Sequence, residues 1–507
     1  MAHQFFNTDR KIRLGIWGLG RGSSFIWSAA AVNIEIVAGC DLNAEAREKF
    51  KENCPDAFVT ADENEFLAFR EMDAVLVATW FNAHAEHSIR ALEAGFHVMC
   101  EVTSFFTPAE SVRLVEAVEK SGKVYNLLEN YPFSKENMYL TGLWKKGFFG
   151  EFQYGEFEYL HDCRTLCYCN LFPDKLVPIG AKMHYWRSWL DFHYYNTHSL
   201  GPLMVMTGLR PEYITAVPED VSLPGFPPGS GMSRPAPSMI KMSNGGVMRN
   251  LCGATTGDYH TCKRIWGTRA SAESVGGGLK ITVGAAGNGI RTVVEPEWPD
   301  EGGALAEKAG HGGGDFWELY YFAREILTGE PAPWDIYAAC DVTLAGIMAV
   351  RSHQAGGQPM EVPDFRLPEV RERWRHDDAV QQRPFDPDRI FPEDADPALT
   401  SGYCELAMRL EKNAILLREA ADGAELYRLM VRDGDKLTVL RKVREAAEAL
   451  PELFRDREQA EKVIAAFPDS VASAALRGML SIAEPEAALG EEALRDKLRK
   501  LLSELIG

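Results

Sequence analysis

The sequence has no hydrophobic run long enough to cross a membrane, because no stretch approaches the ~18 consecutive apolar residues that a spanning helix needs. It also lacks an excess of basic residues: 54 lysines and arginines stand against 73 aspartates and glutamates, a formal net charge of −19. A surface this acidic repels phosphate backbones and anionic lipids. We therefore expect neither a nucleic-acid partner nor a membrane partner.

We also expect neither a secretory signal peptide nor a disulfide framework. The first residues, MAHQFFNTDRK, have no apolar core behind a basic start, so we expect a cytoplasmic protein. Ten cysteines in 507 residues do not make a disulfide framework, and a reducing compartment keeps them as thiols. The densest group, Cys163, Cys167 and Cys169 beside His161, has a spacing that matches no zinc signature. We expect no metal there and interpret these cysteines as small buried or loop side chains.

The sequence does contain enough apolar material for several cores. With 46% hydrophobic and 25% charged residues, a chain of this length is typical of roughly two to four folded units. Changes in pattern divide it into four predicted parts: a first domain over 1–130, a second domain over 131–375, a linker over 376–400 and a helical extension over 401–507.

Short β-rich apolar runs alternate with helical patterns over the first third of the chain. This alternation predicts βαβ units and therefore an α/β fold with a doubly wound, Rossmann-type parallel sheet. Apolar residues recur at helical spacing in Ala85–Ala94 and Pro108–Lys120. The expected strands are Arg13–Trp17, Glu35–Cys40, Ala74–Ala78, His97–Cys100 and Val124–Leu128.

From about Phe148 the apolar period becomes two, as in GEFQYGEFEYLH, which predicts an α+β domain with an open, mostly antiparallel sheet. An open sheet usually buries its outer face against a partner, so we expect a homo-oligomer, either a dimer or a tetramer. Helices are predicted over Asp315–Thr328 and Asp335–His353, and the Pro-rich stretch Pro363–Pro397 reads as an extended linker. The last helix has one apolar face, made by Leu494, Leu498, Leu501 and Leu505.

A glycine-rich turn follows the first predicted strand. The strand IRLGIW leads into Gly18-Leu19-Gly20-Arg21-Gly22-Ser23, and an apolar helix is expected to begin near Phe25. Gly18 permits the tight turn, and Gly20 lets the backbone approach a pyrophosphate, whose charge is stabilised by the N–H groups of the helix start. Ser23 stands at the third glycine position, and Ser23 or Gly22 is small enough for close helix packing.

Asp41 ends the second strand 23 residues after Gly18, where its carboxylate can accept both ribose hydroxyls. A 2′-phosphate would meet that negative charge, so NAD is favoured over NADP. The alternative, a glycine turn without a ligand, is disfavoured because strand, turn, helix and terminal acid are all in register.

Further motifs resemble the Gfo/Idh/MocA oxidoreductases over roughly residues 10 to 370. They are the glycine turn, Asp41, the run Thr79–His84, the pair Glu101-Val102, and Leu128-Glu129-Asn130. The resemblance implies cofactor contacts from Gly18, Gly20, Arg21, Gly22, Ser23, Asp41, Phe81, His84, Glu101, Val102 and Asn130.

One departure points to a particular branch. Sugar dehydrogenases of this family usually have Glu-Lys-Pro where this chain has Glu101-Val102-Thr103, and their lysine helps remove the substrate hydroxyl proton; valine cannot transfer a proton. A Glu-Val pair here is similar to the NAD-dependent glycosidases of glycoside hydrolase family 109. The similarity continues in Tyr159-x-His161, Trp186-Arg187, Tyr195–Pro202, Tyr259 and His311–Asp315, although Asn196 stands where the acetamido-sugar enzymes have proline.

This branch implies a redox-neutral hydrolysis of a small-molecule carbohydrate. NAD takes hydride from C3, the C2 proton becomes acidic, the C1 substituent is eliminated, water adds, and the hydride returns, so the cofactor is tightly bound and recycled. By the same resemblance Tyr159 is the C2 base, with its pKa lowered by Arg187, and His198 accepts the C3 hydroxyl proton. The implied substrate-binding residues are His161, Trp186, Tyr195, Asn196 and Tyr259.

Two other functions stay open. In a sugar dehydrogenase, another residue such as His198 would replace the missing lysine, and NADH would accumulate with each sugar oxidised. In a non-enzymatic nucleotide-binding scaffold, Tyr159 and Tyr259 would be ordinary half-buried sheet tyrosines and the aromatic residues of 185–195 would be core.

Overall fold

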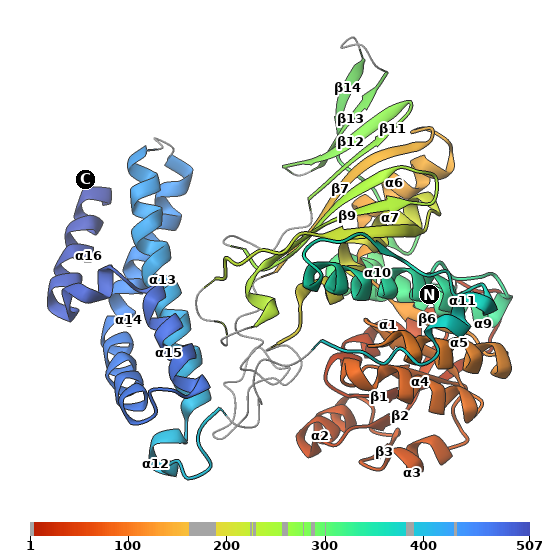
Figure 1. The fold of residues 1–507 in the computed structure, drawn as a ribbon, viewed down its shortest axis with the longest axis horizontal. Coiled ribbons are helices and arrows are strands. Elements are labelled where there is room, and N and C mark those ends of the chain that lie inside the picture. The colour runs from red at the N-terminus through yellow and green to blue at the C-terminus, as the bar shows by residue number, and fades with distance from the viewer. Residues whose placement is uncertain are drawn as a thin grey trace.

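The computed structural model describes three successive parts of the chain, which Figure 1 shows in red to orange, yellow to green and blue. Residues 163, 167 and 169 of the cysteine cluster and the predicted site residues Trp186, Arg187 and Tyr259 lie outside the described residues. The described residues are 5–161, 189–223, 226, 230–255, 262–276, 278–284, 289–299, 301–381, 390–429 and 433–506.

The first part is a six-stranded parallel sheet in the order β3-β2-β1-β4-β5-β6, with helices packed on it. This order confirms the doubly wound Rossmann fold. Strand β3 was missed, because three residues are too short to show a period. The strands are β1 Ile12–Trp17, β2 Ile34–Cys40, β3 Phe58–Thr60, β4 Ala74–Val77, β5 His97–Glu101 and β6 Tyr125–Leu128, and the helices are α2 Ala44–Asn53, α3 Glu63–Ala68, α4 His84–Glu93 and α5 Pro108–Ser121.

The apolar helix expected near Phe25 is shorter and less regular than predicted. The chain forms a 3-10 turn, η1 (Arg21–Phe25), one α turn, α1 (Ile26–Ala29), and a second 3-10 turn, η2 (Ala30–Val32). The hydroxyls of Ser23 and Ser24 donate to the carbonyls of Leu19 and Arg21 at 2.6 and 2.8 Å. Such local side-chain bonds compete with a regular helix, which explains the correction.

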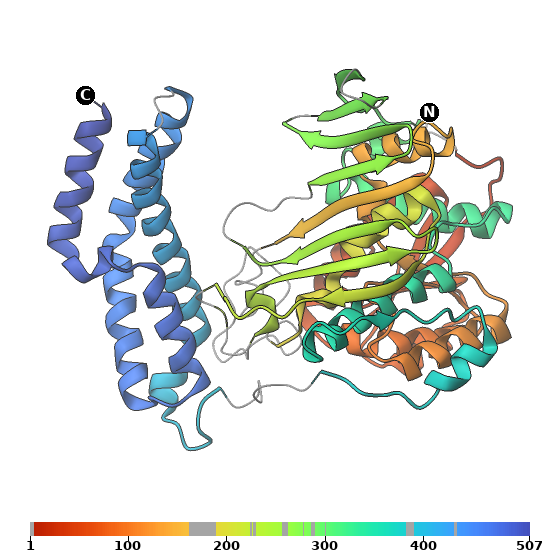
Figure 2. The same cartoon turned by 45° about the horizontal axis from the view of Figure 1, so that its top comes forward.

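The second part contains a nine-stranded sheet in the order β14-β13-β12-β11-β7-β10-β9-β8-β15 among the described residues. Its pairs are antiparallel except for β7 with β10, so the predicted open, mostly antiparallel sheet is confirmed. Figure 2 shows its strands side by side with helices behind them. The strands are β7 Phe152–Leu160, β8 Pro211–Ala216, β9 Pro235–Met242, β10 Val247–Gly253, β11 Lys263–Gly267, β12 Ala270–Val275, β13 Gly278–Val283, β14 Ile290–Val294 and β15 Met360–Glu361.

Helices of the second part join the two sheets. Helix α10 (Ile336–Gln354) contacts β8 of one sheet and β6 of the other, and α7 (Thr197–Thr207) contacts β7. Helix α11 (Pro368–Trp374) lies inside the Pro-rich stretch Pro363–Pro397, which was predicted to be extended. Pro368 stands at the start of the helix, where its missing N–H costs nothing. The remaining helices are α6 Lys135–Lys145, α8 Gly303–Ala306 and α9 Gly314–Thr328.

The third part is helical, as predicted, and its helices pack on one another (Figure 1). The four leucines of the predicted apolar face are all buried, which confirms that this face has a partner. No helix in the described part of the chain is long and apolar enough to span a membrane. The helices are α12 Pro397–Thr400, α13 Tyr403–Leu429, α14 Asp433–Ala466, α15 Val471–Ile482 and α16 Glu491–Ile506.

Candidate active site

The carboxyl ends of the parallel strands bring the predicted cofactor motifs to one edge of the first sheet. Gly18 follows β1, Asp41 follows β2, Thr79 comes two residues after β4, Glu101 ends β5 and Glu129 follows β6. In an open parallel sheet this edge is where ligands bind, because the strand order reverses there and leaves a crevice. The site is built on this edge.

A cavity of about 430 Å³ lies over the ends of β1, β2 and β4. The carboxylate of Asp41 at its rim is held by two backbone groups, the N–H of Leu19 at 2.7 Å and the N–H of Asn43 at 2.8 Å. Each oxygen keeps a second lone pair for a hydroxyl. The lining residues are Trp17, Gly18, Gly20, Cys40, Asp41, Leu42, Asn43, Ala46, Ala61, Glu63, Ala78, Thr79, Trp80, Ala83 and His87.

Two glycines of the turn have no room for a side chain. Gly18 has φ +98°, and a Cβ there would lie 2.3 Å from the carbonyl oxygen of Ala78. A Cβ on Gly22 would lie 2.4 Å from Cγ2 of Ile16. The turn therefore passes close against β1 and β4, which leaves the cavity open above it for a dinucleotide.

The walls of the cavity suit the adenosine half of NAD. They are mostly apolar, and His87 stacks on Trp17 with ring centroids 4.0 Å apart. Burial lowers the pKa of His87 to about 4, so the ring is neutral at pH 7 and presents a flat face. With the Asp41 carboxylate as a hydrogen-bond acceptor at the rim, the cavity fits a ribose that carries free hydroxyls.

Arg21, predicted to contact the cofactor, pairs with two carboxylates in the structure. Its guanidinium donates to Asp315 at 2.7 and 2.8 Å, and its Nε lies 2.8 Å from Oε1 of Glu101. His311 bonds to Asp315 at 2.9 Å, through Nδ1. This cluster joins the glycine turn to α9, so Arg21 positions the turn.

Glu318, one turn further along α9, is a buried acid that sequence reasoning did not single out. Both of its oxygens are without a hydrogen-bond partner among the described residues. Burial, with the nearby charges of Asp315 and Glu101, raises the pKa of Glu318 well above its usual range. Burial therefore favours the neutral form of this carboxyl group.

Two further predicted cofactor residues, His84 and Phe81, lie beside the cavity. His84 is buried, with Nδ1 2.8 Å from the carbonyl oxygen of Thr103 and Nε2 3.0 Å from that of Thr79, so it holds two strand-end loops together. Phe81 packs edge-on against Phe106 at 4.9 Å. Both residues support the rim of the cavity, and the neighbouring Ala83 and His87 line it.

Val102 and Asn130 lie at the ends of β5 and β6. The N–H of Val102 donates to Oε2 of its neighbour Glu101 at 3.2 Å. Asn130 is buried, its side-chain oxygen is without a partner among the described residues, and a Cβ on Gly314 would lie 2.5 Å from its carbonyl oxygen. The unsatisfied amide oxygen marks a position where a ligand donor would fit.

A buried pair, Glu129 with His198, connects the two sheets. Glu129 follows β6 and His198 lies in the first turn of α7; Nδ1 of His198 is 2.9 Å from both Glu129 oxygens. Donation from Nδ1–H to the carboxylate leaves Nε2 of the neutral ring as a proton acceptor. The backbone N–H of Tyr131 also donates to Glu129, at 3.1 Å, and fixes the carboxylate.

Tyr159 and its neighbours surround this pair. Tyr159, near the end of β7, meets His198 edge-on at 4.5 Å, and its hydroxyl lies 3.2 Å from Nδ1 of His161. The ring of Tyr195 lies 5.8 Å from that of His198. Asn196 is fully buried, and neither atom of its side-chain amide has a partner among the described residues. The structure thus brings together five predicted residues: Tyr159, His161, Tyr195, Asn196 and His198.

Comparison with known sequences agrees with this geometry. Residues 12–128 match the oxidoreductase family with an NAD-binding Rossmann fold, and residues 296–375 match the C-terminal domain of glycosyl hydrolase 109. The Rossmann domain of the chain is therefore similar to the Gfo/Idh/MocA oxidoreductases, and a later segment is similar to glycosyl hydrolase family 109. These matches indicate an enzyme of the NAD-dependent oxidoreductase type, as the sequence motifs indicated.

Named relatives of this chain are distant. A glycosyl hydrolase family 109 protein of Shewanella sp. (strain W3-18-1) is 24% identical over 409 residues, which cover 72% of this chain and 86% of that protein. A protein of the same name from Saccharopolyspora erythraea is 26% identical over 417 residues, 73% of this chain and 86% of that protein.

Solved structures share the fold of this chain. A levoglucosan dehydrogenase in complex with NADH and levoglucosan has a TM-score of 0.56 at 19% identity and covers 70% of this chain and 100% of its own. An oxidoreductase from Agrobacterium radiobacter, in complex with NAD+, L-tartaric acid and magnesium, has a TM-score of 0.57 at 15% identity and covers 69% of this chain and 98% of its own.

Several residues of this site belong to the sequence motifs, but the sequence did not predict a role for them. Glu129, Asp315 and His311 are of this kind, and Tyr131, whose ring lies 4.7 Å from that of His198, was not noted at all. Glu129 had a usable signal, because a carboxylate directly after the last strand of a Rossmann sheet lies on the ligand edge.

Proposed function

We propose that this chain is an NAD-dependent, redox-neutral glycosidase that acts on a small-molecule carbohydrate. The observation that carries the proposal is the buried Glu129–His198 pair, which lies against Tyr159 at the carboxyl edge of the Rossmann sheet. His198 and Tyr159 are two proton acceptors of different kinds that lie side by side. They suit two successive proton removals, from the C3 hydroxyl and from the adjacent C2 of the sugar. The valine at position 102 removes the lysine on which a simple dehydrogenase of this family depends.

The cofactor, when bound, supplies an acceptor that takes a hydride from C3 of the sugar and returns it later. His198 takes the C3 hydroxyl proton on Nε2, with Glu129 balancing the resulting imidazolium. Tyr159 takes the C2 proton and exchanges protons with His161 through their 3.2 Å contact. The C1 substituent then leaves and water replaces it, so the net reaction is hydrolysis.

The remaining assignments complete the proposal. Tyr195 and Asn196 bind the sugar, together with Trp186, Arg187 and Tyr259 as the family resemblance implies; Gly18, Gly20 and Asp41 hold a tightly bound, recycled NAD. The chain divides into the four parts given above, at 130, 375 and 400, and works as a cytoplasmic homo-oligomer.

The deciding experiment is turnover in heavy water with a panel of aryl glycosides of both anomeric configurations. Elimination removes the C2 proton, so the sugar released by the wild-type enzyme should have deuterium at C2 by NMR, with no net change in nicotinamide absorbance. The Tyr159→Phe variant should bind NAD but release no aglycone. Aglycone release without deuterium at C2 would refute the mechanism.

A second candidate, a sugar dehydrogenase, is favoured by the fold likeness to the levoglucosan dehydrogenase. It predicts stoichiometric NADH from a free sugar, with no dependence on a leaving group at C1. The same panel, extended by the corresponding free sugars, distinguishes the two functions, because a dehydrogenase would reduce NAD with a free sugar and release no aglycone.

A further inference from the structure

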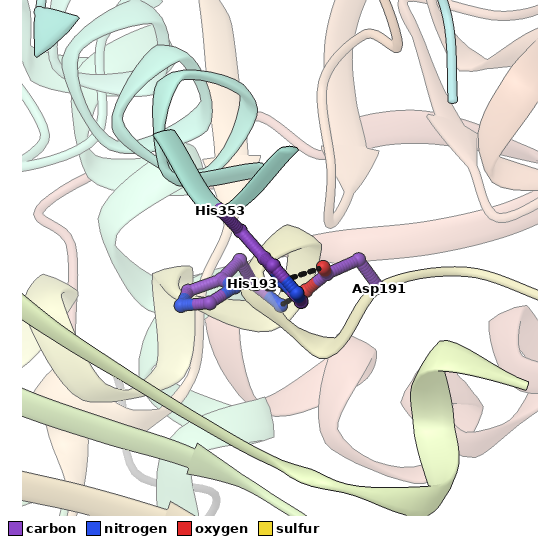
Figure 3. Close-up of side chains that lie close together, drawn as sticks. All are labelled: Asp191, His193 and His353. Carbon is purple, nitrogen blue, oxygen red and sulfur yellow. Dashed lines mark hydrogen bonds and ion pairs between the residues drawn. The ribbon is translucent and has the colours of Figure 1, made fainter. Parts of the chain in front are cut away.

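A cluster of two histidines and an aspartate lies apart from the residues assigned to sugar chemistry. Asp191 caps the 3-10 turn η6 (Phe192–Tyr195), His193 lies in that turn, and His353 is in the last turn of α10. Figure 3 shows the three side chains directed at one another from these two elements. One donor atom from each lies within 4.8 Å of the other two, and Asp191 and His193 are buried.

Each imidazole directs Nδ1 toward the same carboxylate. Nδ1 of His193 is 2.8 Å from Oδ1 of Asp191, and Nδ1 of His353 is 2.7 Å from Oδ2. The second contact is at ion-pair distance, and Nδ1 of His353 is buried beside this carboxylate. One carboxylate between two imidazole nitrogens presents the ligand types that a divalent transition-metal ion takes.

The other ring nitrogen of His193 points away from the cluster. Nε2 lies 3.4 Å from the carbonyl oxygen of Pro237. Donation from Nε2–H to this carbonyl leaves the lone pair of Nδ1 directed at the cluster. A metal-binding histidine almost always has this arrangement, with one nitrogen on the ion and the other donating to a carbonyl or carboxylate.

Glu219 lies near the cluster but is not one of its three ligand residues. Its carboxylate interacts electrostatically with both His353 and Asp191. One oxygen, Oε1, lies 3.4 Å from Nε of Arg234, whereas Oε2 is buried and has no hydrogen-bond partner among the residues described. With neutral imidazoles, the carboxylates of Asp191 and Glu219 together would balance the charge of a divalent cation.

We propose that Asp191, His193 and His353 bind a zinc-type divalent transition-metal ion. Two imidazoles favour zinc over magnesium or calcium, which prefer oxygen ligands. The ion joins α10 to η6, the turn that contains Tyr195, so its role is to stabilise the tertiary structure. The proposal does not depend on the proposed glycosidase activity.

The first test is the metal content of the full chain, purified without a histidine tag and without chelators from cells grown with added zinc. Elemental analysis should find about one zinc per chain after dialysis, and less than a tenth of that in His353→Gln. His97→Gln, which alters a partly buried histidine on β5, is the matched control and should retain the metal. Wild-type protein with no bound metal would overturn the proposal.

The second test does not require a variant to fold well. The wild-type chain is stripped with a chelator under native conditions, and zinc alone is added back during thermal unfolding. The melting temperature should rise with zinc and not with magnesium. If neither ion changes it, the three side chains form only a hydrogen-bonded network and the metal proposal fails, whatever the enzyme assays show.

Discussion

Glu129 acts on the proposed chemistry through His198, so it is a positioning residue. Glu129→Gln replaces the acceptor facing Nδ1 with an amide that can donate, which favours the wrong tautomer of His198. We expect kcat for aglycone release to fall by about 100-fold or more, with the affinity for NAD unchanged and the acid limb of the pH profile shifted. Steady-state kinetics and an NAD titration measure both.

The control for this prediction is Glu156→Gln, which removes a carboxylate of β7 that pairs with Arg249. It should leave kcat within about twofold, a change well below 1 kcal/mol. Equal losses in the two variants, or a Glu129→Gln enzyme with the wild-type pH profile, would show that the buried pair has only a structural role.

His97 should make the chain sensitive to acid. Burial, assisted by the positive charges of Lys123 and Arg10, lowers the pKa of His97 to about 4, and its Nδ1 accepts the N–H of Val124 at 2.9 Å. The unfolded chain binds the proton first, near pH 6.5, so this contribution to stability is complete above that pH and is lost as the pH falls toward 4.

We therefore expect the unfolding free energy of the wild type to fall between pH 7 and pH 5 by on the order of 1 to 2 kcal/mol more than that of His97→Gln. Glutamine keeps an acceptor for the Val124 N–H but does not titrate. Urea unfolding of both proteins across this range measures the difference, and a difference that does not change with pH contradicts the assignment.

Among the elements, the glycine turn after β1 gives the sharpest prediction. Gly18→Ala places a Cβ against the carbonyl of Ala78 at a backbone conformation that L residues avoid. The unfolding free energy should fall by about 2 to 4 kcal/mol, and NAD binding should be lost. Urea unfolding and an NAD titration test both effects.

The Gly95→Ala variant is the control, because it introduces the backbone strain of a positive φ without a steric clash of the new Cβ. Gly95 has a similar φ of +94°, but a Cβ there meets nothing within 4 Å. This variant should lose only about 1 kcal/mol and bind NAD normally. If both variants lose the same stability and keep NAD, the turn does not approach β4 as described.

The elements also show where pattern reasoning works and where it stops. Five strands of the first part, and the long helices α9 and α10 of the second part, were predicted within one or two residues, because their apolar periods extend over whole elements. The irregular helix after the glycine turn was not predicted, since hydroxyl-to-carbonyl bonds from Ser23 and Ser24 decide its shape. Helix α11 was not predicted because the prolines around it are typical of an extended segment.

For the whole molecule, the helical third part is expected to be dispensable for cofactor binding. Its helices α13–α16 have their own buried face, including the four leucines of α16. A chain ending at residue 381 should remain soluble and bind NAD within about twofold of the full chain, because the Rossmann edge is complete without it. Calorimetric titration with NAD measures this, and an insoluble or NAD-free fragment would contradict it.

The sequence by itself determined the βαβ alternation, the glycine turn with Asp41, and the resemblance to the Gfo/Idh/MocA oxidoreductases, because these features depend on local periodicity and short motifs. Only the tertiary structure decided that Glu129 meets His198 across 69 residues and that His353 meets Asp191, since those contacts depend on how α7 and α10 dock between two sheets. Docking geometry is set by the shapes of whole elements, so no spacing along the chain records it.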